Sequence, residues 1–443
     1  MRITTLVSTL VILASLGAAP AANAQTAGDS MMTNMVAWFT GDPSVGDGPS
    51  QQAPDAPKLY AEDTCCADGC CGCCSQCCKC YDTFGSIEYL MWWGRGTSLP
   101  PLVTASPAGT PAISGGVPIA GVLGQPTTDI LFGNQLAGQK MQSGGRVTAG
   151  IWLDPDHNVA AGGRFFGLGG DTTNFSATSA GGATDRVLGV PFTNVLPNTP
   201  PFADAFLVAL NGTQSGTITA KATTNNILGA DAFAEIMMSR DSRRRIDLVG
   251  GYQFFRLDDG LQLNTNSQLI DPTNPLFGTT ISTTDRFTTH NQFHGGQIGL
   301  RARMARGQWS LNTLGVVGLG NMNEQVIING SNTVTSFGVP STTAGGIFTQ
   351  PTNIGTHTQN RFAAIPQLIS NLNYHVTPTL SFHIGYNMMW ITNIALSGDQ
   401  IDTRVNSTQF FGGNLAGPAR PHFQFNDRDY WLQGINYGMN WDF

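Results

Sequence analysis

The chain has 443 residues, a formal net charge of −7 and only 12% charged residues, while glycine occupies 54 positions. Soluble globular domains usually carry about 25% charged residues, and a mildly acidic chain without a basic stripe argues against nucleic acid as a partner. Beyond the N-terminus no run of apolar residues is long enough for a membrane-spanning helix. This composition is typical of a transmembrane β-barrel, whose strands are apolar only at every second residue.

The N-terminal residues 1–24 predict a secretory signal peptide. Arg2 precedes an apolar stretch over residues 6–16, and the small-residue pattern AANAQ follows at residues 21–25. The apolar stretch is shorter than the roughly 20 residues of a spanning helix, and no cysteine stands at the cleavage point to carry a lipid. We expect cleavage after Ala24 and export into a compartment where thiols oxidise.

Residues 25–80 predict a mostly disordered linker, rich in Pro, Gly, Asp and Gln, that ends in the cysteine-rich stretch CCADGCCGCCSQCCKC over residues 65–80. Zinc fingers need separated C-x-x-C knuckles with structure between them, and an oxidising exterior disfavours a cluster of reduced thiols. We therefore expect no metal site. Nine is an odd number, so disulfides with one another and with neighbouring envelope chains are expected for Cys65, Cys66, Cys70, Cys71, Cys73, Cys74, Cys77, Cys78 and Cys80.

Residues 81–443 alternate apolar and polar side chains in ten segments, which predicts β-strands with two different faces. Short connections alternate with long ones, so tight turns gather at one end and long loops at the other, as in outer-membrane barrels. A β-sandwich shows the same alternation but does not sort its loops in this way. We expect an all-β, antiparallel transmembrane barrel of about ten strands, with twelve as the alternative count, over residues 83–94, 144–154, 157–168, 221–238, 245–257, 286–304, 308–322, 360–374, 379–393 and 429–443.

The apolar parity of each segment predicts the lipid-facing side of the wall. In the last segment Tyr437, Met439 and Trp441 share one face, whereas Gln433 falls on the same parity and disagrees. Tryptophans near the segment ends suit the headgroup region. The opposite parity predicts the lumen, where four acids face four arginines together with a histidine and amides: Glu88, Asp231, Glu235, Asp247, Arg146, Arg164, Arg301, Arg303, His383, Gln253, Gln297, Asn371 and Asn387.

The C-terminal strand looks like the signal that the barrel-assembly machinery of bacterial outer membranes reads. That signal has a polar residue, a glycine two positions later and two apolar or aromatic residues at the end. Asn436, Gly438, Trp441 and Phe443 occupy these places. We expect this machinery and the outer-membrane lipid to be partners of the chain.

Several stretches resemble the beta-barrel porin family found mainly in Planctomycetes. They include GSIEYLMWWGRG (85–96), ILFGN (130–134), HIGYNMMWITNIALSGDQID (383–402) and WLQGINYGMNWDF (431–443). The same resemblance covers SGGRVTAGIWLDPDHNVAAGGRFFGLG (143–169) and TTDRFTTHNQFHGGQIGLRAR (283–303). It implies a barrel fold in the cell outer membrane and leaves the activity open.

Three functions remain open. The first is a channel for small solutes, and the second is a structural or surface-display barrel with a polar-plugged lumen. About eight strands leave room only for side chains and aqueous porins use roughly 16 to 18, so ten strands favour a filled bore. The third is a rim enzyme built on Asp258, Asp259, Asp285 or His290. We expect no enzyme and no cofactor, because the usual catalytic and nucleotide-binding motifs do not occur.

Overall fold

The structure is a computed structural model that describes residues 82–443. The predicted signal peptide, the linker and the nine cysteines therefore lie outside the described residues. No helix in residues 82–443 is long and apolar enough to cross a bilayer.

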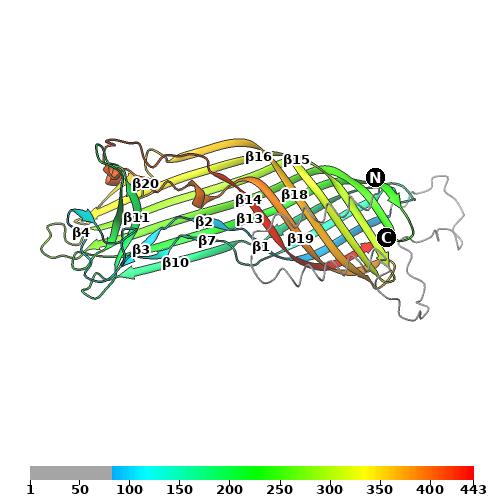
Figure 1. Cartoon of the computed structure of the whole chain (residues 1–443), viewed down its shortest axis with the longest axis horizontal. Helices are drawn as coiled ribbons and strands as arrows, with labels where there is room; N and C mark the ends of the chain where they lie inside the picture. The colour runs from blue at the N-terminus through cyan, green and yellow to red at the C-terminus, as the bar shows by residue number, and fades with distance from the viewer. Residues whose placement is uncertain (1–81) are drawn as a thin grey trace. The chain divides into compact units, whose positions relative to one another are not determined.

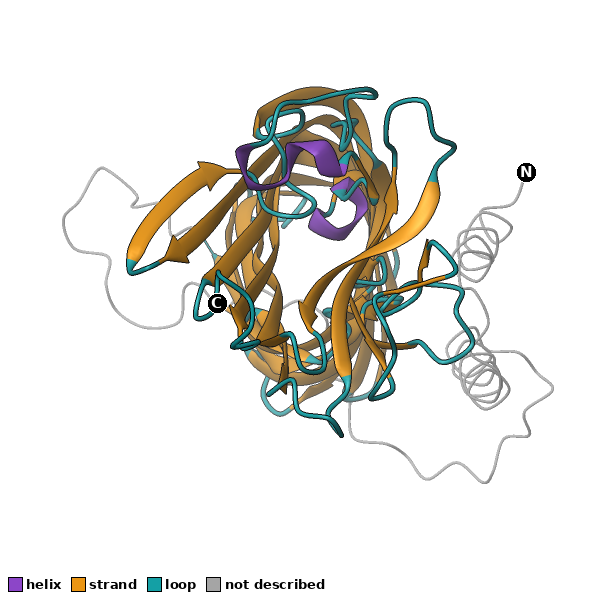
Figure 2. Ribbon diagram, turned by 90° about the vertical axis from the view of Figure 1, so that its left-hand side faces the viewer, coloured by secondary structure: helices purple, strands orange, loops and turns teal. Residues whose placement is uncertain are grey.

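Within residues 82–443, ten antiparallel strands close into a ring, which confirms the predicted barrel (Figures 1 and 2). The first strand pairs with the last from Phe84 to Gly94. The backbone groups of Thr83 and Phe443 exchange two hydrogen bonds of 2.8 Å. The pairing of β9 with β13 completes the ring. Its strands are β1 (Thr83–Gly94), β8 (Gln142–Trp152), β9 (Val159–Leu168), β13 (Gln214–Arg240), β14 (Arg244–Leu269), β15 (Thr280–Arg306), β16 (Trp309–Ser336), β18 (Gly355–His375), β19 (Leu380–Ala395) and β21 (Asp427–Asp442).

The part of the ring near the short turns carries apolar side chains on its outer surface, and we call it the membrane half. In β14 the outward apolar residues run from Ile246 to Phe254, about the 9 to 11 residues of a tilted membrane strand. Gln433 lies on this surface without a slip in register, and its side chain accepts a hydrogen bond of 2.7 Å from Tyr386 Oη. Exposed residues of the same surface include Ile87, Tyr89, Val147, Ile151, Phe165, Ile298, Leu319, Phe382 and Ile384.

Beyond that band, β13, β14, β15 and β16 continue past the ends of β1 and β19 and form what we call the outer half (Figure 1). Here the inward face is apolar and buried. It packs against a separate sheet with the strand order β12-β11-β3-β6. The elements of this half are β2 (Thr97–Leu99), β3 (Val103–Ser106), β4 (Ile113–Ser114), β5 (Val117–Pro118), β6 (Asp129–Phe132), β7 (Gln135–Ala137), β10 (Asp171–Ser179), β11 (Val187–Asn194), β12 (Phe202–Ala209), β17 (Val339–Ala344), β20 (Arg404–Val405) and the 3-10 helices η1 (Ser397–Gln400) and η2 (Ser407–Gly412).

The predicted loops 258–285 and 323–359 were wrong in large part. Strand β14 runs on to Leu269 and β15 begins at Thr280, so only residues 270–279 connect them, and β16 continues to Ser336. The physical reason is the change of surroundings outside the bilayer. An outer surface in water is polar there, so the lipid-facing pattern that marked the predicted strand ends stops while the strand itself continues.

Candidate functional site

A buried polar cluster joins β1, β8, β18, β19 and β21 inside the membrane half. Glu88 accepts two hydrogen bonds from the guanidinium of Arg146, one of them 3.0 Å long. Arg146 also donates to Asn387 Oδ1 at 2.7 Å, and Asn387 donates to Asn436 Oδ1 at 2.7 Å. His383 Nε2 lies 3.5 Å from a Glu88 oxygen. Because every one of these side chains is buried, the cluster braces the wall and leaves none of its charge facing open water.

A second polar cluster lies on β9, β13, β14 and β15. Arg164 Nε donates to Asp231 at 2.7 Å. One oxygen of Glu235 forms an ion pair with Arg301 at 2.7 Å, and the other accepts a hydrogen bond from Arg303 at 2.9 Å.

Arg245, which the sequence analysis missed, completes the second cluster. Its Nε donates to Asp247 at 2.6 Å, and its guanidinium lies 4.8 Å from the ring centre of Trp152. Arg245 lies next to the basic turn at the start of β14, where it resembles an ordinary turn residue. Only its place on the inward parity of β14 indicated a position in the bore.

The four acids, four arginines and one histidine predicted for the lumen all belong to these two clusters. Each acid has an arginine partner. Taking a charge out of water costs several kcal/mol unless a partner and hydrogen bonds compensate for it. The arrangement therefore pairs its acids with arginines, as expected of polar groups that fill a narrow bore.

Above the polar clusters, an apolar layer crosses the bore. Nine of the ten ring strands in the described residues contribute to it. Trp92 packs against Phe166 with 5.2 Å between ring centres. The side chains with exposed fractions of 0 to 1% are Leu90, Trp92, Ile227, Phe255, Leu257, Phe293, Met322, Ala363, Ile365, Met389, Ile391, Ile394, Leu396, Tyr430 and Leu432.

This layer adds apolar side chains to the inward face, beside the polar residues predicted for the lumen. Leu90 and Trp92 share the inward parity of Glu88, but the predicted lumen set contained polar residues alone. A path wide enough for a water molecule would leave the side chains that line it accessible to water. Because the layer is inaccessible, it seals the bore at this level, and apolar cavities of this kind stay dry.

Two buried acids hold the elements of the outer half against the ring. Asp285 accepts hydrogen bonds from the backbone N–H groups of Ile347, Phe348 and Thr349 at 2.8 to 2.9 Å and from the Thr349 hydroxyl at 2.7 Å. Asp259 accepts from the backbone N–H of Ser397 at 2.8 Å. Burial raises the pKa of both carboxyls, and the hydrogen bonds counteract part of that increase. The two acids thus act as anchors for loops.

Asp258 and His290 form a pair on the opposite, outward face of the same strands. His290 Nδ1 lies 2.9 Å from Asp258. Asp258 also accepts 2.7 Å hydrogen bonds from Arg256 and Asn226, and these partners lower its pKa although burial opposes them. The structure thus brings together one Asp and one His of the four residues considered for a rim enzyme. It places Asp259 and Asp285 elsewhere, facing inward.

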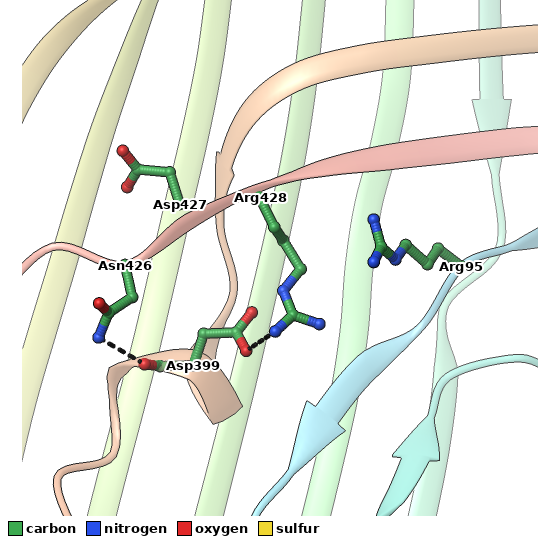
Figure 3. A pocket seen from close by; sticks show the side chains of 5 residues that line it. All are labelled: Arg95, Asp399, Asn426, Asp427 and Arg428. Atoms are coloured by element: carbon green, nitrogen blue, oxygen red, sulfur yellow. Dashed lines mark hydrogen bonds and ion pairs between the residues drawn. The ribbon is translucent and has the colours of Figure 1, made fainter. Parts of the chain in front are cut away.

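A polar cavity of about 420 Å³ opens where β1 ends, next to η1 and the start of β21 (Figure 3). Its lining consists of Arg95, Asp399, Asn426, Asp427 and Arg428. Arg428 is ion-paired with one oxygen of Asp399. Burial raises the pKa of Asp399 to about 6, and Arg428 limits the increase.

Glu324 lies close to this cavity and shares a hydrogen-bond donor with one of its acids. Gln359 Nε2 donates both to Glu324 and, at 3.0 Å, to Asp427, while Arg361 pairs with Asp427 at 3.0 Å. Burial raises the pKa of Glu324 to about 7, and the neighbouring Asp427 adds to the increase. The acid is thus partly protonated near neutral pH. Across residues 82–443, no group of three or more His, Cys, Asp or Glu side chains could hold a metal ion.

The family model described as "Putative beta barrel porin-7 (BBP7)" matches residues 84–443. The chain belongs to this family. The match begins within β1 and covers the ring and the outer half, which confirms the predicted family and an outer-membrane β-barrel. No curated protein matches the sequence.

Solved structures of outer-membrane proteins match the chain at low identity and with low TM-scores. The outer membrane protease OmpT from Escherichia coli is 11% identical over 82% of this chain and 97% of its own, with a TM-score of 0.36. A Pseudomonas aeruginosa FadL homologue is 9% identical over 82% of this chain and 90% of its own, with a TM-score of 0.21. An anion-selective porin from Comamonas acidovorans is 8% identical over 82% and 99%, with a TM-score of 0.15. These likenesses concern the fold alone.

The four residues of the predicted assembly signal have different surroundings in this member of the porin-7 family. Asn436 is buried in the first polar cluster. Gly438 has no room for a side chain, since a Cβ there would lie 2.2 Å from the Ile87 carbonyl oxygen. Trp441 packs closely on Gly85, and Phe443 is exposed. Reading by the assembly machinery stays a prediction.

Proposed function

We propose that this member of the beta barrel porin-7 family is a closed outer-membrane barrel that carries a folded outer half, and that it is not an open diffusion channel. The observation that carries the proposal is the apolar layer across the bore, whose side chains include Trp92, Phe293 and Met322 at 0 to 1% exposure. Aqueous porins have wider barrels of roughly 16 to 18 strands. The charges below the layer support the same conclusion, because each acid there has an arginine partner inside the bore.

Planar-bilayer recording of the purified chain tests the proposal. We expect no stepwise conductance from the folded protein. Conductance steps that appear with the full-length chain, and that grow with the amount inserted, would contradict it.

A channel for small solutes is the second candidate, because the family takes its description from porins. It requires the apolar layer to move or hydrate. A swelling assay on proteoliposomes with small sugars measures solute transport independently. Solute entry would be detected even where the ionic conductance is too small to record.

We infer that the barrel is not an enzyme. On the outward face Asp258 is engaged by Arg256 and Asn226 as well as by His290, so its carboxylate is held by structural partners. A general base has to reach the proton that it removes. Incubation with casein should give no cleavage, and cleavage that His290→Ala abolishes would overturn this inference.

We also propose that residues 1–24 are removed during export and that the cysteine segment, residues 65–80, forms disulfides within the chain and with neighbouring envelope proteins. The odd number of cysteines supports a bond between chains. Electrophoresis of the mature protein with and without reductant tests it. A band pattern that does not respond to reductant would exclude intermolecular bonds.

A further inference from the structure

The outward surface of the outer half carries very few charges, and all of them are positive. We call this surface the outer face. It consists of every second residue over 172–178 in β10, 217–223 in β13, 260–268 in β14, 280–288 in β15 and 329–335 in β16. Its charged side chains are Lys221 and Arg286, since Asp285, the one acid in these ranges, faces inward. Protein surfaces in water usually mix charges of both signs, so this face is unusual in a chain with a net charge of −7.

Hydroxyl and amide side chains form rows across the outer face. One row crosses six strands and consists of Thr178, Thr217, Asn266, Ser282, Thr333 and Thr342. Three pairs of neighbours in this row are hydrogen-bonded through their side chains, at 2.9 to 3.2 Å. Such groups both donate and accept hydrogen bonds, and adjacent strands repeat them about every 4.8 Å. The rows therefore suit a chain of sugars, whose hydroxyl groups also donate and accept.

The two cations of the outer face lie in one row. Lys221 is opposite Gln262, which in turn is opposite Arg286. Both cations are exposed, and neither side chain has an ion pair or a hydrogen bond with another of residues 82–443. Two strand spacings place them about 10 Å apart, so both long side chains can reach one anionic group above Gln262. Arginine and lysine bind phosphate and carboxylate through charge-assisted hydrogen bonds.

The outer face continues directly into the lipid-facing surface, because the same strands carry both. Phe165, Phe254, His294 and Phe362 lie in one row across the ring, with Phe165 and Phe362 exposed. A girdle of aromatic side chains marks the membrane boundary of such barrels. Gln262 follows Phe254 by eight residues on β14, about 26 Å along the strand. A molecule anchored in the outer leaflet beside this girdle therefore has the outer face alongside its polar part.

We propose that the outer face binds the sugar chain of an anionic glycolipid that is anchored in the same membrane. Its acyl chains contact the membrane half, its sugars lie on the rows of hydroxyl and amide groups, and a phosphate or carboxylate of its sugar chain binds Lys221 and Arg286. Charge complementarity selects an anionic chain, and the continuity of the two surfaces selects one with a lipid anchor. The proposal is independent of whether the bore conducts.

Fluorescence anisotropy of labelled lipopolysaccharide with the full-length chain in detergent tests the proposal. We expect saturable binding of the intact glycolipid. The same glycolipid with its phosphates removed and its carboxylates reduced to alcohols should bind at least about tenfold more weakly. The polysaccharide released from its acyl chains should also bind at least about tenfold more weakly, because it loses its contacts with the membrane half and its high local concentration beside the barrel.

Substitutions on the outer face locate the site. Lys221→Gln combined with Arg286→Gln should weaken binding of intact lipopolysaccharide by at least about tenfold, and Gln262→Glu should also weaken it by placing a carboxylate between the two cations. Arg243→Gln combined with Arg244→Gln removes two positive charges at the exposed short turn before β14 and is the matched control, which should bind as the native chain does. Lys221→Gln alone changes an exposed side chain on β13, so its stability should be native.

Several outcomes would overturn the proposal. One is native binding by the variant that lacks both cations, and another is equal affinity for the intact and the uncharged glycolipid. Equal affinity for the glycolipid and the released polysaccharide would show that a soluble polysaccharide, and not an anchored one, is the ligand. The comparison of the three probes uses the native chain, so the test stands even where a variant does not fold. Circular dichroism establishes folding of each variant.

Discussion

The membrane half and the outer half of this barrel share the same strands but use them in opposite ways. In β14, Leu248, Tyr252 and Phe254 lie on the outward face of the membrane half, whereas Leu257, Leu261 and Leu263 lie on the inward face further along. Strand alternation itself does not change. What changes is the solvent on the outside, because lipid favours apolar side chains there and water does not.

The interiors differ for the same reason. The membrane half holds paired charges in its bore beside one small apolar cluster around Phe233 and Val249, while its lipid-facing surface is apolar. The outer half needs an apolar core, and the sheet that contains β3 and β11 supplies the other layer of that core. The apolar layer around Trp92 lies where one arrangement gives way to the other. Substitutions in the apolar layer, the polar clusters and the outer half should therefore change different properties, namely conductance, unfolding stability and local hydrogen exchange.

The largest effect is expected from the apolar layer. Trp92→Ala combined with Phe166→Ala removes two packed rings, and each truncation of a buried aromatic residue costs about 3 to 5 kcal/mol of stability. We expect the double variant, refolded in bilayers, to conduct ions where the native chain does not. Trp93→Ala, the neighbouring outward position, is the matched control and should stay silent. A silent but folded double variant would place the seal in the outer half instead.

Variants of the ion pair between Arg164 and Asp231 distinguish the contribution of charge pairing from that of packing in the membrane half. Asp231→Leu leaves a buried guanidinium without its partner, which costs about 3 to 5 kcal/mol. Adding Arg164→Met should restore most of that loss, because apolar replacements of a whole buried pair are often neutral. Urea unfolding in detergent measures both variants. A single variant as stable as Lys221→Gln would show that the pair is not buried in the folded barrel.

The anchor at Asp285 tests whether the outer half can loosen by itself. Asp285→Ala removes the acceptor of three backbone N–H groups, at about 1 kcal/mol each, so a local loss of about 3 kcal/mol is expected. Hydrogen exchange should increase over residues 346–353 and stay unchanged in β1 and β21. Asp271→Asn, an exposed turn substitution, serves as the control. Uniform loss of protection would mean that the two halves unfold together.

The smallest effect concerns pH and Glu324. Because its pKa is raised from 4.5 to about 7, the stability that it contributes is complete below about pH 4.5 and is lost as the pH increases through about 7. Between about pH 5 and pH 8 the native chain should lose about 1 to 2 kcal/mol relative to Glu324→Gln, since screening by water reduces the effect of the shift. Urea unfolding at both pH values measures this difference, and parallel pH profiles of the two proteins would contradict it.

Much of the fold follows from local sequence. The strand β1 has the predicted bounds of residues 83–94, because both of its faces carry a clear pattern over its full length. The ends of β14, β15 and β16 were missed, since the lipid-facing pattern stops at the bilayer while the strands continue. The cavity around Asp399 could not be predicted, because its lining comes from segments more than 300 residues apart.

The sequence by itself determined the number of ring strands, their lipid-facing parity and the charges inside the bore. Alternation with a period of two is a property of each strand alone, so it can be read without knowledge of the neighbours. Only the tertiary structure decided which arginine meets which acid, that Trp92 and its partners close the bore, and that a second sheet fills the outer half. These contacts depend on the stagger and curvature of the closed ring, which no single strand records.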